Sequence, residues 1–118
     1  MINIKEMSRE FSMVEQYLMT IAPSIVSMKD VKDGEHITVD GILVFDDVKE
    51  GTGETVTVMS IITPDKKVYS CQSATFKRSI NDIANIMKDK PFTVIKTSGK
   101  TKNKRDYINC VLDIESIG

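Results

Sequence analysis

The sequence predicts a single, mainly β domain with two helices, and three observations carry that prediction. The 118 residues suit one domain, and 41% of them are hydrophobic, which is enough for an ordinary core. Five segments rich in β-branched residues largely alternate between apolar and polar positions, as strands do. Residues 1–22 and 73–89 instead repeat apolar side chains every three or four positions, as amphipathic helices do.

The first segment, residues 1–22, predicts a helix that ends before Pro23. Its apolar residues follow the a/d pattern of one helix face, and they are Ile4, Met7, Phe11, Val14, Leu18 and Ile21. Two interpretations stay open for this stripe. It can cover one end of the domain, or it can be a seam for self-association, although it is too short for a convincing coiled coil.

The remaining residues, 35–115, predict five strands and a second helix. The expected strands cover residues 37–48, 55–63, 68–72, 92–98 and 106–114, and the helix follows Ser73, a plausible N-cap. Alternation in the first strand breaks at Gly41, which predicts a bulge or bend. Three strands, a helix and two strands are the layout of the five-stranded OB-fold barrel, in which a bent strand contributes to both halves of the sheet. An open α+β sheet with both helices on one face is the alternative.

Residue types that carry catalysis or bind metals are scarce. Cys71 and Cys110 lie far apart and form no CxxC pair, and His36 has no cysteine or second histidine near it. Two buried, reduced thiols are therefore the favoured interpretation. Without a nucleophile and base or a set of metal ligands, we expect neither an enzyme nor a metal or other cofactor.

Acidic residues gather in residues 46–54, between the first two expected strands. Asp46 and Asp47 are residue types that bind Mg²⁺ or form an acid/base pair, but neighbours on a strand point apart. A solvated loop is the favoured interpretation. In an OB layout this loop faces the ligand, so its acids, including Glu50, predict modest and salt-sensitive affinity for an anion.

Two observations bear on location. No apolar run approaches the roughly 18 residues that a membrane span needs. The first eleven residues carry charges too early for a secretory signal. We therefore expect a cytoplasmic protein with no membrane partner.

The distribution of charge singles out residues 96–105. The net charge is −1, yet this segment holds five bases and no acid. Its Gly99-Lys100-Thr101 matches the end of a P-loop, but the first glycine of that motif falls on Val94 and no helix follows. The segment instead predicts a hairpin tip that neutralises phosphates, with an ordinary solvated turn as the alternative. The bases are Lys96, Lys100, Lys102, Lys104 and Arg105.

Binding of single strands also needs exposed aromatic rings on which bases stack, and two tyrosines are candidates. Tyr107 alternates with Ile108, so we expect it to point out of the barrel beside the basic loop. Tyr69, in the short third strand, is the second candidate, and Lys66 and Lys67 before it are secondary contacts to the DNA backbone. A tyrosine packed on the barrel surface is the alternative for each ring.

Two segments resemble a known family. “SCQSATFKRSINDI” (70–83) and “SGKTKNKRDYINCVLD” (98–113) are similar to small single-stranded DNA-binding proteins of phages and conjugative plasmids of Gram-positive bacteria, and the resemblance spans residues 37–113. It implies a non-enzymatic OB fold that coats single-stranded DNA during replication or transfer in the host cell. It also implies that the strand is contacted by Lys100, Lys102, Lys104, Arg105 and Tyr107.

The predicted function is therefore largely sequence-independent binding of single-stranded DNA through the basic loop and the tyrosines, with RNA left open as a ligand. The alternative is a protein-interaction module or accessory factor that uses the apolar stripe of residues 4–21. Binding of an oligonucleotide at low salt distinguishes the two.

Overall fold

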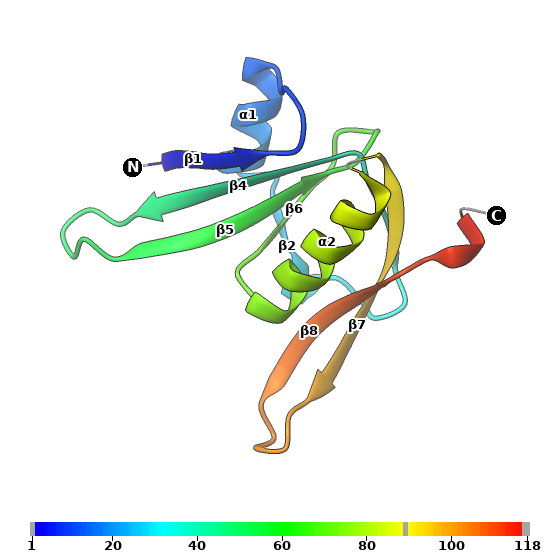
Figure 1. The fold of residues 1–118 in the computed structure, drawn as a ribbon. Helices are drawn as coiled ribbons and strands as arrows, with labels where there is room; N and C mark the ends of the chain where they lie inside the picture. The colour runs from blue at the N-terminus through cyan, green and yellow to red at the C-terminus, as the bar shows by residue number, and fades with distance from the viewer. Residues whose placement is uncertain (1, 89, 117–118) are drawn as a thin grey trace.

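The computed structural model describes residues 2–88 and 90–116, and it is mainly β with two helices, as predicted (Figure 1). Short 3₁₀ turns follow β2 and β8, at Met28–Asp30 and Ile114–Ser116. The other elements in chain order are β1 (Ile2–Met7), α1 (Met13–Thr20), β2 (Val26–Ser27), β3 (His36–Val39), β4 (Gly41–Val48), β5 (Thr55–Ile62), β6 (Val68–Cys71), α2 (Ala74–Met87), β7 (Phe92–Lys100) and β8 (Asp106–Leu112).

The strands form two sheets. One has the order β1-β4-β5-β6-β2 and the other the order β3-β7-β8. All neighbours are antiparallel except β2 and β6, which pair in parallel, so the first sheet is mixed. Among the described residues the strand pairs do not close a barrel, because no strand of the first sheet pairs with a strand of the second. The closed five-stranded OB barrel is therefore not confirmed.

The strand predicted over residues 37–48 bends at Gly41 and contributes to both sheets, as expected. It divides into β3, which pairs with β7, and β4, which pairs with β5. The bend needs glycine for space, because a Cβ at Gly41 would lie only 2.6 Å from the Cε1 atom of Phe11. The close approach of a buried ring therefore explains why the alternation breaks at this residue.

The helix predicted over residues 1–22 is wrong in its first part. Ile2–Met7 is a strand that pairs with β4, and α1 begins only at Met13. Ser12 caps it, because its Oγ accepts from the Glu15 amide at 3.1 Å while Glu15 Oε1 accepts from the Ser12 amide at 3.0 Å. This capping box starts the helix locally, and the hydrogen bonds offered by β4 outweigh the helical spacing upstream of it.

The apolar stripe predicted for self-association does not form one face. Ile4 and Met7 lie exposed on β1, whereas Phe11, in the chain that joins β1 to α1, is buried in the core. On α1 itself Val14 is 67% exposed, and Ile21 is 63% exposed at the C-cap. The sixth member of the stripe, Leu18, is half-buried. A single helical seam through these six residues is therefore excluded.

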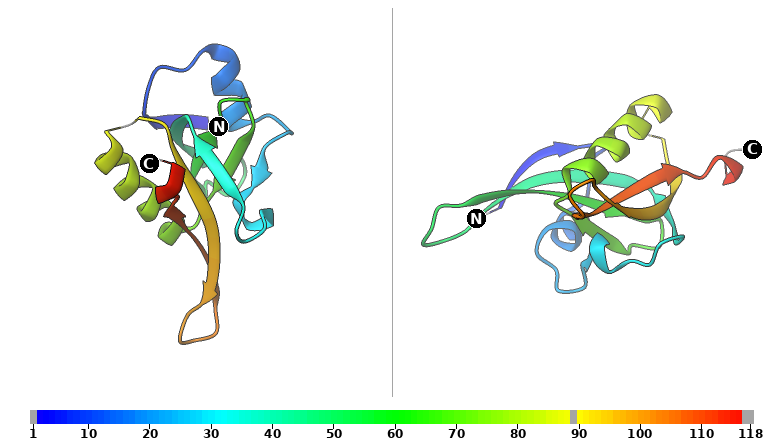
Figure 2. Two further views of the ribbon diagram at one scale, coloured as in Figure 1. Left: turned by 90° about the vertical axis from the view of Figure 1, so that its right-hand side faces the viewer. Right: turned by 90° about the horizontal axis from the view of Figure 1, so that it is seen from below.

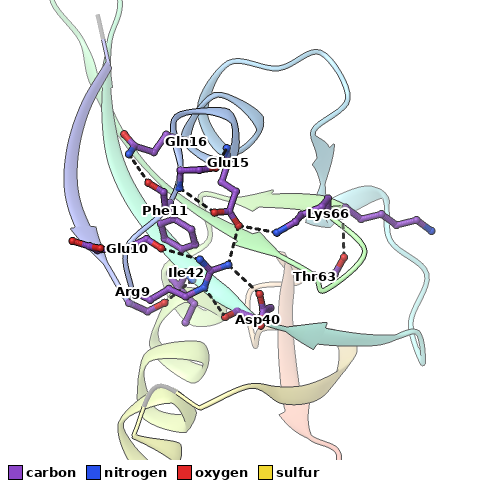
Figure 3. Close-up of polar contacts among 12 residues, drawn as sticks. Arg9, Glu10, Phe11, Glu15, Gln16, Asp40, Ile42, Thr63 and Lys66 are labelled. Atoms are coloured by element: carbon purple, nitrogen blue, oxygen red, sulfur yellow. Dashed lines mark hydrogen bonds and ion pairs between the residues drawn. The ribbon is translucent and has the colours of Figure 1, made fainter.

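A charge network joins the N-terminal segment to the bend (Figure 3). Nη2 of Arg9 lies 3.0 Å from carboxylate oxygens of both Glu15 and Asp40, and its guanidinium stacks 4.4 Å from the centre of the Phe11 ring. Nζ of Lys66 reaches the same Glu15 oxygen at 2.9 Å. Hydrogen bonds from Arg9, from a backbone amide and from Lys66 hold the pKa of Glu15 well below its usual range.

The core has two parts because α1 and α2 cover opposite faces of the five-stranded sheet (Figure 2). Along β5, Met59 and Ile61 belong to the part beneath α2, while Val58 and Ile62 belong to the part beneath α1. This double cover explains why residues 58–62 are buried in succession without a polar face. The placement of both helices on one face, which the open-sheet alternative predicted, is therefore wrong.

The second helix forms as predicted and lies between the two sheets (Figure 1). Its N-cap is Ser73, whose Oγ accepts from the amide of Phe76 at 3.3 Å. Phe76, Ile80 and Ala84 follow the helical repeat and are buried against both sheets. The β7–β8 hairpin extends beyond this packed region (Figures 1 and 2). None of the helices in the described ranges has the length and apolar character that a membrane crossing requires.

Candidate nucleic-acid interface

The basic segment forms the tip of the β7–β8 hairpin. Lys100 and Asp106 are the last register pair of the two strands. The amide of Thr101 donates to the Arg105 carbonyl at 2.9 Å, and Lys104, in the left-handed region with φ of 59°, donates back to Thr101 at 2.9 Å. The sequence prediction of a short turn at this place agrees with the structure.

Four basic side chains at this tip face solvent: Lys100, Lys102, Lys104 and Arg105. The ion pair from Lys100 Nζ to Asp106 is long, at 4.0 Å, and both side chains are more than 70% exposed. Water screens such a pair, so Asp106 compensates little of the charge. The result is a concentrated positive potential on a protein of net charge −1.

Lys96 has an internal role that differs from the one predicted for it. The residue is only 4% exposed, and its Nζ donates to the Val31 carbonyl at 2.8 Å and lies 3.2 Å from an Asp33 carboxylate oxygen. The ammonium is therefore satisfied inside the fold and holds the loop before β3 against β7. Strand alternation carries the missed signal, because Lys96 shares its face with the buried Phe92 and Val94.

Tyr107 lies at the base of the tip and is 37% exposed. It is the register partner of Gly99 on β7. A Cβ on Gly99 would lie 2.5 Å from the Tyr107 hydroxyl oxygen, so the ring rests against the β7 backbone. The phenol thus keeps part of its surface available beside the basic side chains.

An open groove runs from the hairpin to the start of α2. The loop after β2, the end of β6 and both hairpin strands contribute to it. Its lining residues are Ser27, Lys29, Ser70, Cys71, Gln72, Ser73, Lys96, Ser98, Gly99, Lys100, Asp106, Tyr107 and Ile108. Small hydroxyl side chains beside lysines can donate hydrogen bonds to phosphate and sugar oxygens without selecting a base.

Sequence reasoning missed Lys29, Gln72 and the serines of this groove. They come from segments that are separate in the chain, and no periodicity connects such segments. The segment “SCQSATFKRSINDI” contains Gln72, Ser70 and Ser73, so the family resemblance carried the available signal. Lys29 has no comparable signal.

The other predicted contacts lie elsewhere. Tyr69 is half-buried against the core beneath α2 and lines a different groove, together with Lys66 and Lys67. The ammonium of Lys66 is engaged by Glu15. The structure therefore does not bring Tyr69 and Tyr107 into one groove.

The titratable groups away from the hairpin tip include a buried thiol and a histidine paired with a carboxylate. Burial, and to a smaller extent the neighbouring Cys71, raises the pKa of Cys110 to about 12, so this thiol stays protonated. His36 Nδ1 lies 2.9 Å from an oxygen of Asp113, which joins the start of β3 to the end of β8. In the part of the chain that the structure describes, no three His, Cys, Asp or Glu residues are grouped so as to hold a metal ion.

The fold and the site define a small, mainly β domain with an exposed basic hairpin beside an open groove, an arrangement suited to an extended anionic ligand. A family model described as phage single-stranded DNA-binding protein matches residues 13–113. The chain therefore belongs to the family of phage single-stranded DNA-binding proteins. Both segments that predicted a resemblance to such proteins lie inside the match, so that prediction is confirmed for phages. Comparison with curated proteins and with solved structures finds no match to the chain.

Proposed function

We propose that this protein binds single-stranded DNA without enzymatic activity and with little sequence preference during phage replication, and that the β7–β8 hairpin and its groove form the interface. The observation that carries the proposal is the exposed basic tip on a member of this family. Family membership supports the ligand, while exposure, charge and the groove support the location.

In the proposed mechanism, different side chains contact the phosphates and the bases. The four basic side chains of the tip neutralise phosphates and release the counterions that these phosphates hold. Tyr107 offers a ring on which a base stacks, worth about 1–3 kcal/mol per base. Neither interaction reads a base edge, so the proposal accounts for low sequence preference.

The proposed contact set is narrower than the predicted one. Lys96 and Lys66 are left out because their ammonium groups already have partners inside the protein. Lys67 and Tyr69 stay predicted secondary contacts in their own groove. The alternative function, an interaction module built on the stripe of residues 4–21, loses its basis because those side chains do not share a face.

We expect binding to weaken steeply with salt. If the tip neutralises three to four phosphates, log K should fall against log[salt] with a slope of about −2 to −3, since each contact to a single strand contributes about −0.7. Fluorescence anisotropy of a labelled oligothymidylate, titrated across salt concentrations, measures the slope. Duplex DNA of equal length should bind more weakly. The same titration with a single-stranded RNA of equal length shows whether RNA is also a ligand. An affinity that is indifferent to salt contradicts the phosphate contacts.

A further inference from the structure

Gly99 occupies a position where its backbone gives no reason for glycine. It lies within β7, and its φ is outside the left-handed region in which Gly34, Gly51 and Gly53 are found. Glycine in a strand costs stability, because it fixes a flexible backbone and packs no side chain. A different requirement must therefore select a glycine here.

The ring of Tyr107 supplies that requirement. A Cβ at Gly99 would lie 2.5 Å from the Tyr107 hydroxyl oxygen, 2.7 Å from Cζ and 3.0 Å from Cε1. Contacts under 3.0 Å essentially never occur for real Cβ atoms, so the ring occupies the space in which a side chain at residue 99 would stand. The phenol therefore folds back across the hairpin instead of extending into solvent.

Packing against Gly99 restricts the rotamers of the Tyr107 side chain, which an ordinary surface position would leave free. A mobile ring loses rotamer freedom when a base stacks on it, and that loss reduces affinity. A ring already held against the β7 backbone has paid most of this loss during folding. Because Tyr107 stays 37% exposed and lines the groove, the restriction leaves surface for a ligand.

We propose that Gly99 is a positioning residue. Because it has no side chain, the Tyr107 ring can lie against the β7 backbone in the groove, where a base of single-stranded DNA can stack on it. The proposal rests on the proposed function, because it assigns the held ring to DNA stacking. The proposal adds Gly99, an uncharged residue with no proposed contact to phosphate, to the residues on which DNA binding depends.

The test is a double-mutant cycle on oligothymidylate affinity. Gly99→Ala should displace the ring and weaken binding by at least about fivefold, the lower end of what one stacked base contributes. In a Tyr107→Ala background the same substitution should change affinity little, because no ring is left to displace. Equal weakening in both backgrounds, or no weakening in the wild-type background, overturns the positioning role.

A measurement without DNA keeps the two proposals distinguishable. In the wild-type chain the ring current of Tyr107 should shift the Gly99 Hα resonances relative to the Tyr107→Ala variant, and Gly99→Ala should alter the Tyr107 ring signals. Absence of both effects shows that the ring is not seated and overturns the inference. Failure of the wild-type chain to bind oligonucleotide instead overturns the proposed function, and the stacking role with it, even where the ring is seated.

Discussion

Replacing the four basic side chains of the hairpin tip by glutamate should remove most single-stranded DNA binding while the fold stays intact. The residues are Lys100, Lys102, Lys104 and Arg105. Each substitution changes the charge by two, which takes the formal net charge from −1 to −9. The variant loses its counterion release and repels the phosphates, so we expect affinity at about 50 mM salt to fall by more than about 100-fold. Anisotropy of the labelled oligothymidylate measures it.

A control with a similar change of charge separates the hairpin from net charge, because reversing three lysines elsewhere takes the formal net charge from −1 to −7. Lys49, Lys88 and Lys90 are exposed, and Lys88 is the C-cap of α2. The C-terminal end of α2 lies remote from the hairpin tip (Figure 1). Reversing these three lysines should lower affinity far less than reversing the tip. Both variants should unfold within a few degrees of the wild type, because exposed substitutions usually change stability by less than about 0.5 kcal/mol. Retained binding by the tip variant contradicts the proposed interface.

The largest loss of stability should follow from Phe76→Ala. Phe76 is fully buried in the first turn of α2, where it packs in the core shared by both sheets. Its truncation removes apolar burial and leaves a cavity, which costs about 3–5 kcal/mol. A small domain has only about 5–15 kcal/mol to lose, so the variant should approach the limit of folding. Urea unfolding followed by circular dichroism measures the free energy of unfolding.

Ile86→Ala on the same helix is the control for that experiment. Ile86 is 76% exposed, so its truncation should change the free energy of unfolding by less than about 0.5 kcal/mol. A cost below about 1 kcal/mol for Phe76→Ala would contradict the position of α2 as the helix that joins the two sheets.

Elements with strong local signals could be predicted from sequence. The second helix has a regular apolar repeat and a Ser73 cap, and the structure has both. The strand β7 begins at Phe92, directly after Pro91, and β8 begins at Asp106, directly after the basic turn, as the alternation predicted. The break in alternation at Gly41 predicted the bend, because it marks the residue at which the side chains that point to the core change.

Elements that depend on tertiary pairing could not be predicted. Ile4 and Met7 have helical spacing by coincidence, and only the free edge of β4 turns their segment into a strand. The two residues of β2 carry no pattern of their own, yet their parallel pairing with β6 decides how that sheet ends. Propensity is a weak guide wherever a neighbouring strand supplies the hydrogen bonds.

The candidate site likewise has a part that could be predicted from sequence and a part that depends on tertiary structure. The hairpin tip is continuous in sequence, so its charges could be found from the sequence alone. The groove is assembled from separate segments, and burial is the reason why Lys96 is left out of the proposed contacts while the bases of the tip stay exposed. The reason for Gly99 became visible only from the placement of Tyr107 across the hairpin.

The most direct test of the proposed interface is an amide chemical-shift map of the ¹⁵N-labelled wild-type chain titrated with oligothymidylate. We expect the largest shifts on residues 98–107 of the hairpin and on the groove residues Lys29 and Gln72. We expect small shifts for α1 and for residues 49–54 at the β4–β5 tip, because this tip lies apart from the β7–β8 tip (Figure 1) and not beside it as the OB layout predicted. Shifts that concentrate on α1 or on the β4–β5 tip and spare the hairpin would contradict the proposed interface.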